Sequence, residues 1–192
     1  MSKIECQVCE FASLAFDNFL DLSLPFPKGA VSYTSQTTLD RCLTEFTKTE
    51  MLDGQEKYYC TKCKKPQRCS KQLSVYRFPK VLVLHLKRFK YSTWRKEKLN
   101  ISVDFPVTGL DMTPYAGNSK HASVKKAKSY SLYGISHHSG YMGGGHYVAD
   151  TLNPEDGKWY HCDDSRVSKG STPGASSSAY VLFYVRDDVK SK

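Results

Sequence analysis

The chain has 192 residues, 40% of them hydrophobic and 24% charged, with a formal net charge of +9. A chain of this length can bury one core, with or without a small satellite lobe, and its composition gives no sign of disorder. No apolar run is long enough to span a membrane and no secretory signal opens the sequence, so we expect no membrane partner.

In chain order, an alternating apolar stretch over residues 16–24 predicts a half-buried strand. Thr38 is the expected N-cap of a short amphipathic helix. The apolar residues of this helix, at helical spacing, are Leu39, Cys42, Leu43 and Phe46. Residues 73–78 predict a returning strand that stops at Pro79.

The second half of the chain predicts several strands of one sheet. The β-branched run Val81–Phe89 predicts a central strand, whereas residues 111–129 lack periodicity and predict a loop. Two segments predict a hairpin, residues 145–150 and 158–163, whose turn contains Asn153-Pro154 and Asp156-Gly157. Further short strands are expected over residues 99–105, 130–137 and 179–185.

Four of the seven cysteines form two Cys-x-x-Cys pairs, Cys6 with Cys9 and Cys60 with Cys63. Each pair offers two thiolates from one tight turn, and Zn²⁺ binds four thiolates in a tetrahedron. We therefore expect one structural zinc ion, with no open position for water; the alternative is four reduced cysteines that merely lie near turns. An odd cysteine count without a secretory signal favours an intracellular protein of the cytoplasm or the nucleus.

A histidine and two acids in the predicted hairpin are typical of the acid–base half of a cysteine-protease site. If Asp150 pairs with Trp159, His146 faces Asp163 directly, with Cβ atoms roughly 4.5–5.5 Å apart. The carboxylate would then accept from the Nδ1–H of His146 and leave Nε2 to take a proton from a thiol. In this register Asp164 points to the opposite face, from which it could bind backbone or polarise the site.

Three glycines, Gly143, Gly144 and Gly145, precede His146. Glycines lose more backbone entropy on folding than other residues, so a strip of them makes sense where another chain must approach closely. The alternative is a core histidine beside a strand-end turn at Asp163.

None of the other three cysteines is a convincing nucleophile. Cys42 lies on the apolar face of its predicted helix and should be buried. Cys69 has basic neighbours that would lower the pKa of its thiol, but it lies in the predicted zinc lobe. Cys162 should face away from His146, because it lies on an alternating strand next to Asp163.

Residues 60–100 contain thirteen lysines and arginines and a single acid, Glu97. Such a segment could bind nucleic acid. However, aromatic residues do not interleave the charges as single-strand binding requires. We therefore favour a solvated basic face that is attracted to some acidic surface over a nucleic-acid partner.

Several motifs in this order resemble the ubiquitin-specific protease family of papain-like thiol proteases, over nearly the whole chain. They are the two cysteine pairs, Leu84–Phe89, Tyr133–Tyr147, Trp159–Ser165 and Tyr180–Tyr184. The resemblance implies an α+β fold with an antiparallel palm sheet and a zinc-ribbon fingers lobe. Residues 1–79 would form the fingers region and residues 80–192 the palm region, together one incomplete catalytic domain.

The resemblance also implies roles for individual residues. His146 would be the general base, Asp163 would orient it, and Asp164 would assist. The implied fingertip zinc ligands are Cys6, Cys9, Cys60 and Cys63. The loop from His138 to Gly145 would gate the tail of ubiquitin, whose C-terminal glycine is the point of cleavage. The implied substrate-binding residues are His138, Gly144, Gly145 and Tyr147, and the implied partners are ubiquitin and ubiquitinated proteins.

The sequence departs from the family in one respect. The family's cysteine box, an Asn-x-x-Asn-Thr-Cys-like segment near the start of the domain, is absent, and with it the nucleophile and the helical thumb. We therefore expect the parent protein to be a thiol-dependent ubiquitinyl hydrolase, and this chain to be inactive without the thumb segment as a partner. Two alternatives stay open, a non-catalytic ubiquitin-binding module and, less favoured, a zinc-ribbon nucleic-acid binder.

Overall fold

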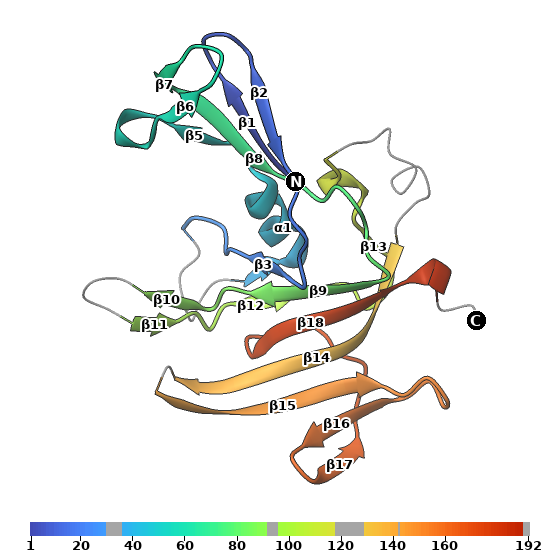
Figure 1. The fold of residues 1–192 in the computed structure, drawn as a ribbon. Coiled ribbons are helices and arrows are strands. Elements are labelled where there is room, and N and C mark those ends of the chain that lie inside the picture. The colour runs from blue at the N-terminus through green and yellow to red at the C-terminus, as the bar shows by residue number, and fades with distance from the viewer. Residues whose placement is uncertain (30–35, 92–95, 118–128, 142, 190–192) are drawn as a thin grey trace.

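Within the described part of the chain, an eight-stranded sheet forms one end of the molecule and a small four-stranded sheet forms the other (Figure 1). Helix α1 lies between the two sheets in this view. Most of the loop predicted over residues 111–129 lies outside the described residues. No helix in the described residues is long and apolar enough to cross a membrane. The computed structural model describes residues 1–29, 36–91, 96–117, 129–141 and 143–189.

The smaller sheet and a separate β-ribbon form a small lobe. Its strands are β1 (Ser2–Cys6), β2 (Ala12–Ala15), β5 (Glu50–Leu52), β6 (Tyr58–Cys60), β7 (Lys65–Gln67) and β8 (Cys69–Leu73), with the 3-10 turn η1 (Gly54–Glu56) before β6. The sheet order is β2-β1-β8-β5, the ribbon pairs β6 with β7, and all of these pairs are antiparallel. Two segments that are far apart in the sequence, residues 1–15 and 50–73, therefore meet in one lobe.

The larger sheet has the strand order β17-β16-β15-β14-β18-β9-β3, and β13 pairs with β14. Its strands are β3 (Leu22–Leu24), β9 (Val81–Leu86), β13 (Leu110–Asp111), β14 (Ser129–Tyr141), β15 (Gly144–Leu152), β16 (Trp159–Asp163), β17 (Arg166–Lys169) and β18 (Ala179–Arg186). Every pair is antiparallel except β3 with β9. The predicted antiparallel sheet is confirmed, and β9 lies inside it as predicted.

Shorter elements surround the two sheets. They are β4 (Gln36–Thr38), β10 (Phe89–Tyr91), β11 (Lys96–Lys98), β12 (Ser102–Asp104), η2 (Thr113–Tyr115) and η3 (Asp187–Val189). β4 pairs with β12 in parallel, and β10 pairs with β11 as an antiparallel ribbon.

Three predicted strands are much shorter in the structure, and one of them, predicted over residues 99–105, is reduced to β12. Of the strand predicted over residues 16–24, only the last three residues form β3; the preceding apolar side chains stay at the surface, and Leu20 is 93% exposed. Of the strand predicted over residues 73–78, only Leu73 belongs to a strand. Val75 instead forms an isolated bridge to Ala116, because the chain changes partner there.

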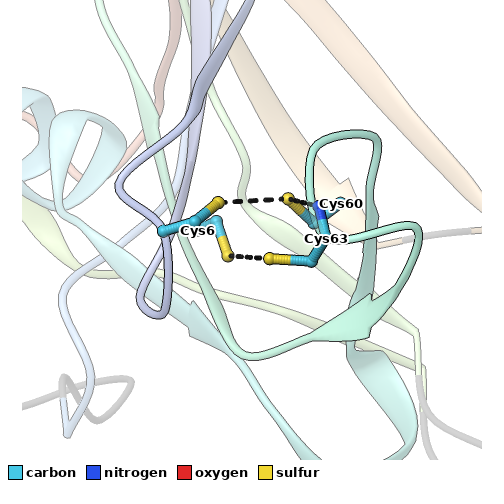
Figure 2. Close-up of side chains that lie close together, drawn as sticks. Cys6, Cys60 and Cys63 are labelled. Atoms are coloured by element: carbon cyan, nitrogen blue, oxygen red, sulfur yellow. Dashed lines mark hydrogen bonds between the residues drawn. The ribbon is translucent and has the colours of Figure 1, made fainter.

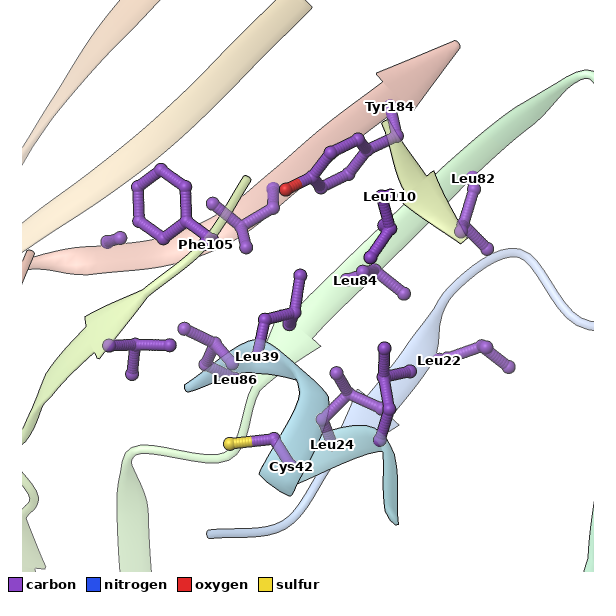
Figure 3. Close-up of a cluster of buried hydrophobic side chains, with 14 of the residues drawn as sticks. Leu22, Leu24, Leu39, Cys42, Leu82, Leu84, Leu86, Phe105, Leu110 and Tyr184 are labelled. Carbon is purple, nitrogen blue, oxygen red and sulfur yellow. The ribbon is translucent and has the colours of Figure 1, made fainter. Parts of the chain in front are cut away.

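Helix α1 (Leu39–Thr47) covers the larger sheet and forms the core with it (Figure 3). The side chain of Thr38 accepts a hydrogen bond from the Arg41 backbone N–H, which confirms the predicted N-cap. The buried face of the helix meets leucines of β9 and β18. These fully buried side chains are Leu39, Cys42, Leu43, Leu82, Leu84, Leu86 and Leu182. Residues 1–79 therefore form more than the small lobe. They also contain β3, which is a strand of the larger sheet, and α1, which packs against that sheet.

A buried cation, the Arg88 guanidinium, connects the segment around residues 99–101 with the segment that leads into β18. Its Nε donates to the carbonyl of Ala179 at 2.6 Å, and its Nη1 donates to the carbonyls of Leu99 and Ile101, each at 2.9 Å. Its Nη2 donates to the carbonyl of Ser176 at 3.2 Å. Burial lowers the pKa of Arg88 to about 10, so the side chain remains charged at neutral pH.

Replacing Arg88 with Met should lower the free energy of unfolding by about 2–5 kcal/mol, because four carbonyl oxygens would lose their donor. Urea unfolding followed by tryptophan fluorescence measures this change. The neighbouring Lys87 is exposed, so Lys87→Met should change the free energy of unfolding by less than about 0.5 kcal/mol. Equal effects of the two substitutions would contradict the role assigned to Arg88.

Candidate functional site

Two Cys-x-x-Cys turns face each other in the small lobe and bring four thiols together (Figure 2). The Sγ atoms of Cys6, Cys9, Cys60 and Cys63 lie within 4.8 Å of one another. The distance from Cys6 to Cys63 is 4.0 Å and that from Cys9 to Cys60 is 3.6 Å. Four sulfur atoms bound tetrahedrally at about 2.3 Å from zinc would be about 3.8 Å apart. The four residues therefore fit a tetrahedral metal site and could hold a metal ion.

Both turns have the same backbone form. The N–H of Glu10 donates to the Cys6 carbonyl at 2.9 Å, and the N–H of Lys64 donates to the Cys60 carbonyl at 2.7 Å. Both residues that donate these hydrogen bonds have a left-handed backbone conformation, with φ of 59° at Glu10 and 56° at Lys64. This conformation costs a non-glycine residue roughly 1–2 kcal/mol. The repeated turn directs both thiols of each pair toward one point.

The thiols of the cluster are electrostatically unequal. The backbone N–H groups of Cys9 and Val8 lower the pKa of Cys6 to about 6. Hydrogen bonding to the Cys9 side chain, together with burial, raises the pKa of Cys63 to about 12. The cluster therefore accommodates one thiolate readily and resists further negative charge, so four thiolates would require a cation among them.

β15 and β16 form the predicted hairpin, but in a different register. Asp150 pairs with His161, and Leu152 pairs with Trp159, so the predicted pairing of Asp150 with Trp159 is wrong. Trp159 is buried in the core and Leu152 packs against it. This apolar pair favours the observed register, because a shift of the strands would expose one of the two side chains.

His146 and Asp163 nevertheless meet, as predicted. Nε2 of His146 lies 2.5 Å from Oδ1 of Asp163, and the two side chains are 50% and 43% exposed. Continuing the observed register would place Asp163 opposite Val148, which makes His146 its diagonal neighbour rather than its direct partner. Diagonal neighbours are roughly 7–8 Å apart, a gap that these two side chains can bridge.

His146 contacts Asp163 through Nε2 and not through Nδ1, the ring nitrogen that was predicted. Its Nε2–H donates to Asp163, whereas the sequence analysis assigned this role to Nδ1. Nε2 is the ring nitrogen farther from the backbone, so it is the one that reaches a diagonal partner. A proton held on Nε2 makes Nδ1 the proton-accepting nitrogen of the neutral ring.

Asp164 also lies near the imidazole, so the prediction that it points to the opposite face is wrong. One of its carboxylate oxygens lies within 4.8 Å of the ligand atoms of both His146 and Asp163. Asp163 pairs with Arg166 across a two-residue turn, in which Asp164 has a φ of 49°. A left-handed residue interrupts the strict alternation of a strand, on which the prediction relied.

The two carboxylates raise the pKa of His146. The hydrogen bond that His146 donates to Asp163 is the largest cause, the charge of Asp163 is the second, and the charge of Asp164 adds to them, whereas burial opposes the change. The imidazole is therefore a stronger base than a free histidine, and Asp163 stabilises its protonated form.

The glycines before His146 differ in what surrounds them. A Cβ on Gly145 would lie 2.3 Å from Nε2 of His138 and 2.4 Å from the Ser139 carbonyl oxygen, so packing within this chain requires glycine there. A Cβ on Gly144 would meet only Tyr141, at an ordinary distance of 3.8 Å. The surrounding residues therefore leave room for a Cβ at Gly144 and not at Gly145.

His138 and Tyr147 pair directly across β14 and β15, with ring centroids 4.7 Å apart. His138 is buried, and within the described residues its Nδ1 has no hydrogen-bond partner. Tyr147 is 54% exposed. Strand alternation places both side chains on the face opposite to that of His146, whereas Gly144 is on the same face as His146.

The remaining cysteines are free thiols away from His146. Cys42 is buried, and burial raises its pKa to about 11. Burial and the neighbouring thiols raise the pKa of Cys69, so the lowering predicted from its basic neighbours is wrong. Cys162 lies 3.9 Å from Oγ1 of Thr151, on the opposite face from His146 as predicted.

Sequence reasoning missed one polar cluster beside the site. Asp150 contacts Nε2 of His137 at 2.9 Å and Nδ1 of His161 at 2.7 Å. The three residues lie on β14, β15 and β16. Alternating polar residues on these strands were the available signal, but only the correct register brings them together.

A family model described as "Ubiquitin carboxyl-terminal hydrolase" matches residues 2–184. Ubiquitin carboxyl-terminal hydrolase 2 of Gallus gallus is 45% identical over 184 residues, which is 95% of this chain and 49% of that protein. The protein of the same name from Homo sapiens is 43% identical over 184 residues, which is 95% of this chain and 29% of that protein. The chain thus spans about half, or less, of the length of these relatives.

Solved structures with the same fold agree with this match. A SAGA DUB module bound to monoubiquitin has a TM-score of 0.79 and 34% identity, over 96% of this chain and 39% of that chain. A SAGA DUB module bound to ubiquitin aldehyde has a TM-score of 0.77 and 33% identity, over 96% of this chain and 40% of that chain. The predicted fold, an antiparallel sheet with a cysteine-rich lobe, is confirmed, and this chain belongs to the ubiquitin carboxyl-terminal hydrolase family.

Proposed function

We propose that this chain supplies the general-base half of a thiol-dependent enzyme that hydrolyses the bond to the C-terminal glycine of ubiquitin. The observation that carries this proposal is the 2.5 Å contact between two half-exposed side chains, His146 near the start of β15 and Asp163 at the end of β16. Family membership supports it, and so do the similar solved modules bound to monoubiquitin and ubiquitin aldehyde. The proposed partners are ubiquitin and ubiquitinated proteins.

In the proposed reaction, Asp163 keeps one proton on Nε2 of His146, and Nδ1 accepts the proton of the attacking thiol. The thiolate bonds to the carbonyl carbon of the ubiquitin glycine. The bond from that carbon to the leaving nitrogen then breaks as Nδ1–H gives its proton to the amine. Water hydrolyses the resulting thioester with Nδ1 as the base. Asp163 stabilises the imidazolium throughout, and Asp164 adds negative charge nearby.

The nucleophile in this proposal comes from a thumb segment that the chain itself does not supply. Four of the seven thiols form the cysteine cluster that could hold a metal ion, and Cys42 and Cys69 are buried with raised pKa values. Cys162 lies on the wrong face of the sheet. The same distribution of thiols favours a second candidate function for the chain by itself, a non-catalytic ubiquitin-binding module.

We further propose that the ubiquitin tail passes Gly144, which has an open face on the same side as His146. His138 and Gly145 would act through packing, because the imidazole occupies the space that a Gly145 side chain would need. The exposed ring of Tyr147 would offer an additional contact at the strand end.

The four clustered cysteines, Cys6, Cys9, Cys60 and Cys63, are the proposed ligands of one structural zinc ion. Four thiolates complete the tetrahedron, so the ion would stabilise the lobe and leave no site for water. Free thiols also support the proposal that the protein is intracellular, in the cytoplasm or the nucleus.

The first prediction of this proposed function concerns the metal. The purified chain should contain about one zinc ion per molecule, and Cys60→Ser should remove it because one of four ligands is lost. Elemental analysis by mass spectrometry measures the content. Cys162→Ser is the matched control and should retain the metal, since Cys162 is outside the cluster. A wild-type chain without zinc, or a Cys60→Ser chain that keeps it, would refute the site.

The second prediction concerns catalysis. Combining this chain with the cysteine-bearing segment of a relative should release a fluorogenic group from the C-terminus of ubiquitin. His146→Ala should lower kcat/KM by about 10²–10⁴-fold, since the general base is lost.

Cys162→Ser should leave this rate unchanged. If that variant is inactive, the nucleophile is in this chain after all. If the combined protein binds ubiquitin without cleaving it, the non-catalytic function is correct.

The third prediction concerns pH. The two carboxylates raise the pKa of His146, and the base must be neutral to act. Asp164→Asn should therefore lower this pKa and shift the acidic limb of the pH–rate profile to lower pH. Asp163→Asn should lower the pKa further, because it also weakens the hydrogen bond. Histidine NMR titration measures both, and a pKa that rises in either variant would contradict the assignment.

A further inference from the structure

One carboxylate ties three neighbouring strands together beside the proposed site. Asp150 on β15 contacts His137 on β14 through one oxygen and His161 on β16 through the other, at 2.9 and 2.7 Å. Nδ1 of His137 lies 3.0 Å from the hydroxyl of Ser178, just before β18. The network therefore crosses from β16, the second strand of the larger sheet, to the start of β18 in its middle.

His146 and Asp163 belong to different parts of this sheet. The strand of His146 pairs with β14 from Gly144 to Thr151, and the strand of Asp163 pairs with β17 up to Asp163 itself. The described backbone pairing between β15 and β16 runs from Leu152 to Ala149 and stops there. His146 and Asp163 lie beyond the end of this short ladder, so their separation depends on how firmly it holds.

Apolar packing secures only one end of the ladder. Leu152 and Trp159, next to the turn, contact the core. Two pairs further along, Asp150 and His161 line an open polar cavity of about 480 Å³ with Lys169. At this end the contacts of Asp150 are charge-assisted hydrogen bonds, which are directional and hold two side chains in a defined geometry.

We propose that Asp150 is a positioning residue that, through His137 and His161, fixes β16 against β15 and thereby sets the separation of the His146 ring and the Asp163 carboxylate. The importance of this role for catalysis rests on the proposed function. The role itself does not, because the separation is a property of this chain.

The test is a histidine NMR titration of the full chain with Asp150→Ala and His161→Ala. Loosening the pairing of β15 with β16 weakens the contact of His146 with Asp163, so both variants should lower the pKa of His146, as Asp163→Asn should. A purely electrostatic effect predicts opposite changes in the two variants. Asp150→Ala removes an acid and would lower the pKa of His146, whereas His161→Ala removes a protonatable group and would raise it. The two variants therefore separate positioning from a simple electrostatic effect.

Asp156→Asn is the matched control. Asp156 accepts from the Tyr160 hydroxyl at 2.7 Å in the turn of the same hairpin, away from the site. The control should leave the pKa of His146 unchanged. An unchanged pKa in a folded His161→Ala chain, a raised one, or an equal fall in the control would overturn the proposal. If Asp150→Ala does not fold, His161→Ala decides by itself.

The combined enzyme distinguishes this proposal from the proposed function. If wild type cleaves ubiquitin while His161→Ala changes neither kcat nor the pKa of His146, the positioning role fails and the function stands. If wild type does not cleave ubiquitin but both variants lower the pKa as expected, the positioning role stands and the function fails.

Discussion

The apolar pairing of Leu152 with Trp159 determines where the polar groups of the site lie. Among the described residues of β15 and β16, these two side chains are the ones that pack in or against the core, and their burial fixes the register of the two strands. Every group further along the two strands takes its position from that pair. The contact of His146 with Asp163 is therefore a consequence of hydrophobic packing four to six residues away, although both side chains are themselves half exposed.

The two ends of the molecule are stabilised by different means. The larger sheet has a continuous apolar core against α1, whereas the buried residues of the small lobe are Cys6, Cys60 and Cys69. So few buried side chains supply little hydrophobic free energy, and small lobes of this kind commonly depend on a bound metal. The two left-handed residues after the cysteine pairs fit this interpretation, since they position thiols at a conformational cost that metal binding can offset.

The sequence was sufficient for the features that rest on local patterns. The cysteine spacing, the N-cap at Thr38 and the run from Val81 each depend on neighbouring residues, and all three were predicted correctly. The register of the β15–β16 hairpin was predicted wrongly. A turn two residues longer or shorter leaves the same side chains on each face of the strands, so the alternation of apolar and polar residues does not distinguish the two registers. The ring nitrogen of His146 and the face of Asp164 depended on that register and on a left-handed turn, which no pattern in the sequence indicates.

The buried guanidinium of Arg88 has a consequence for how the protein responds to its surroundings. Each hydrogen bond described for it ends on a main-chain carbonyl, a group that does not ionise between strongly acidic and strongly basic solution. Because the cation keeps its charge until the pH approaches its pKa of about 10, and because it is shielded from dissolved ions, the junction should tolerate changes in salt and changes in acidity below that pH. The scaffold can thus stay constant while the exposed imidazole titrates, which separates the chemistry of this protein from its folding.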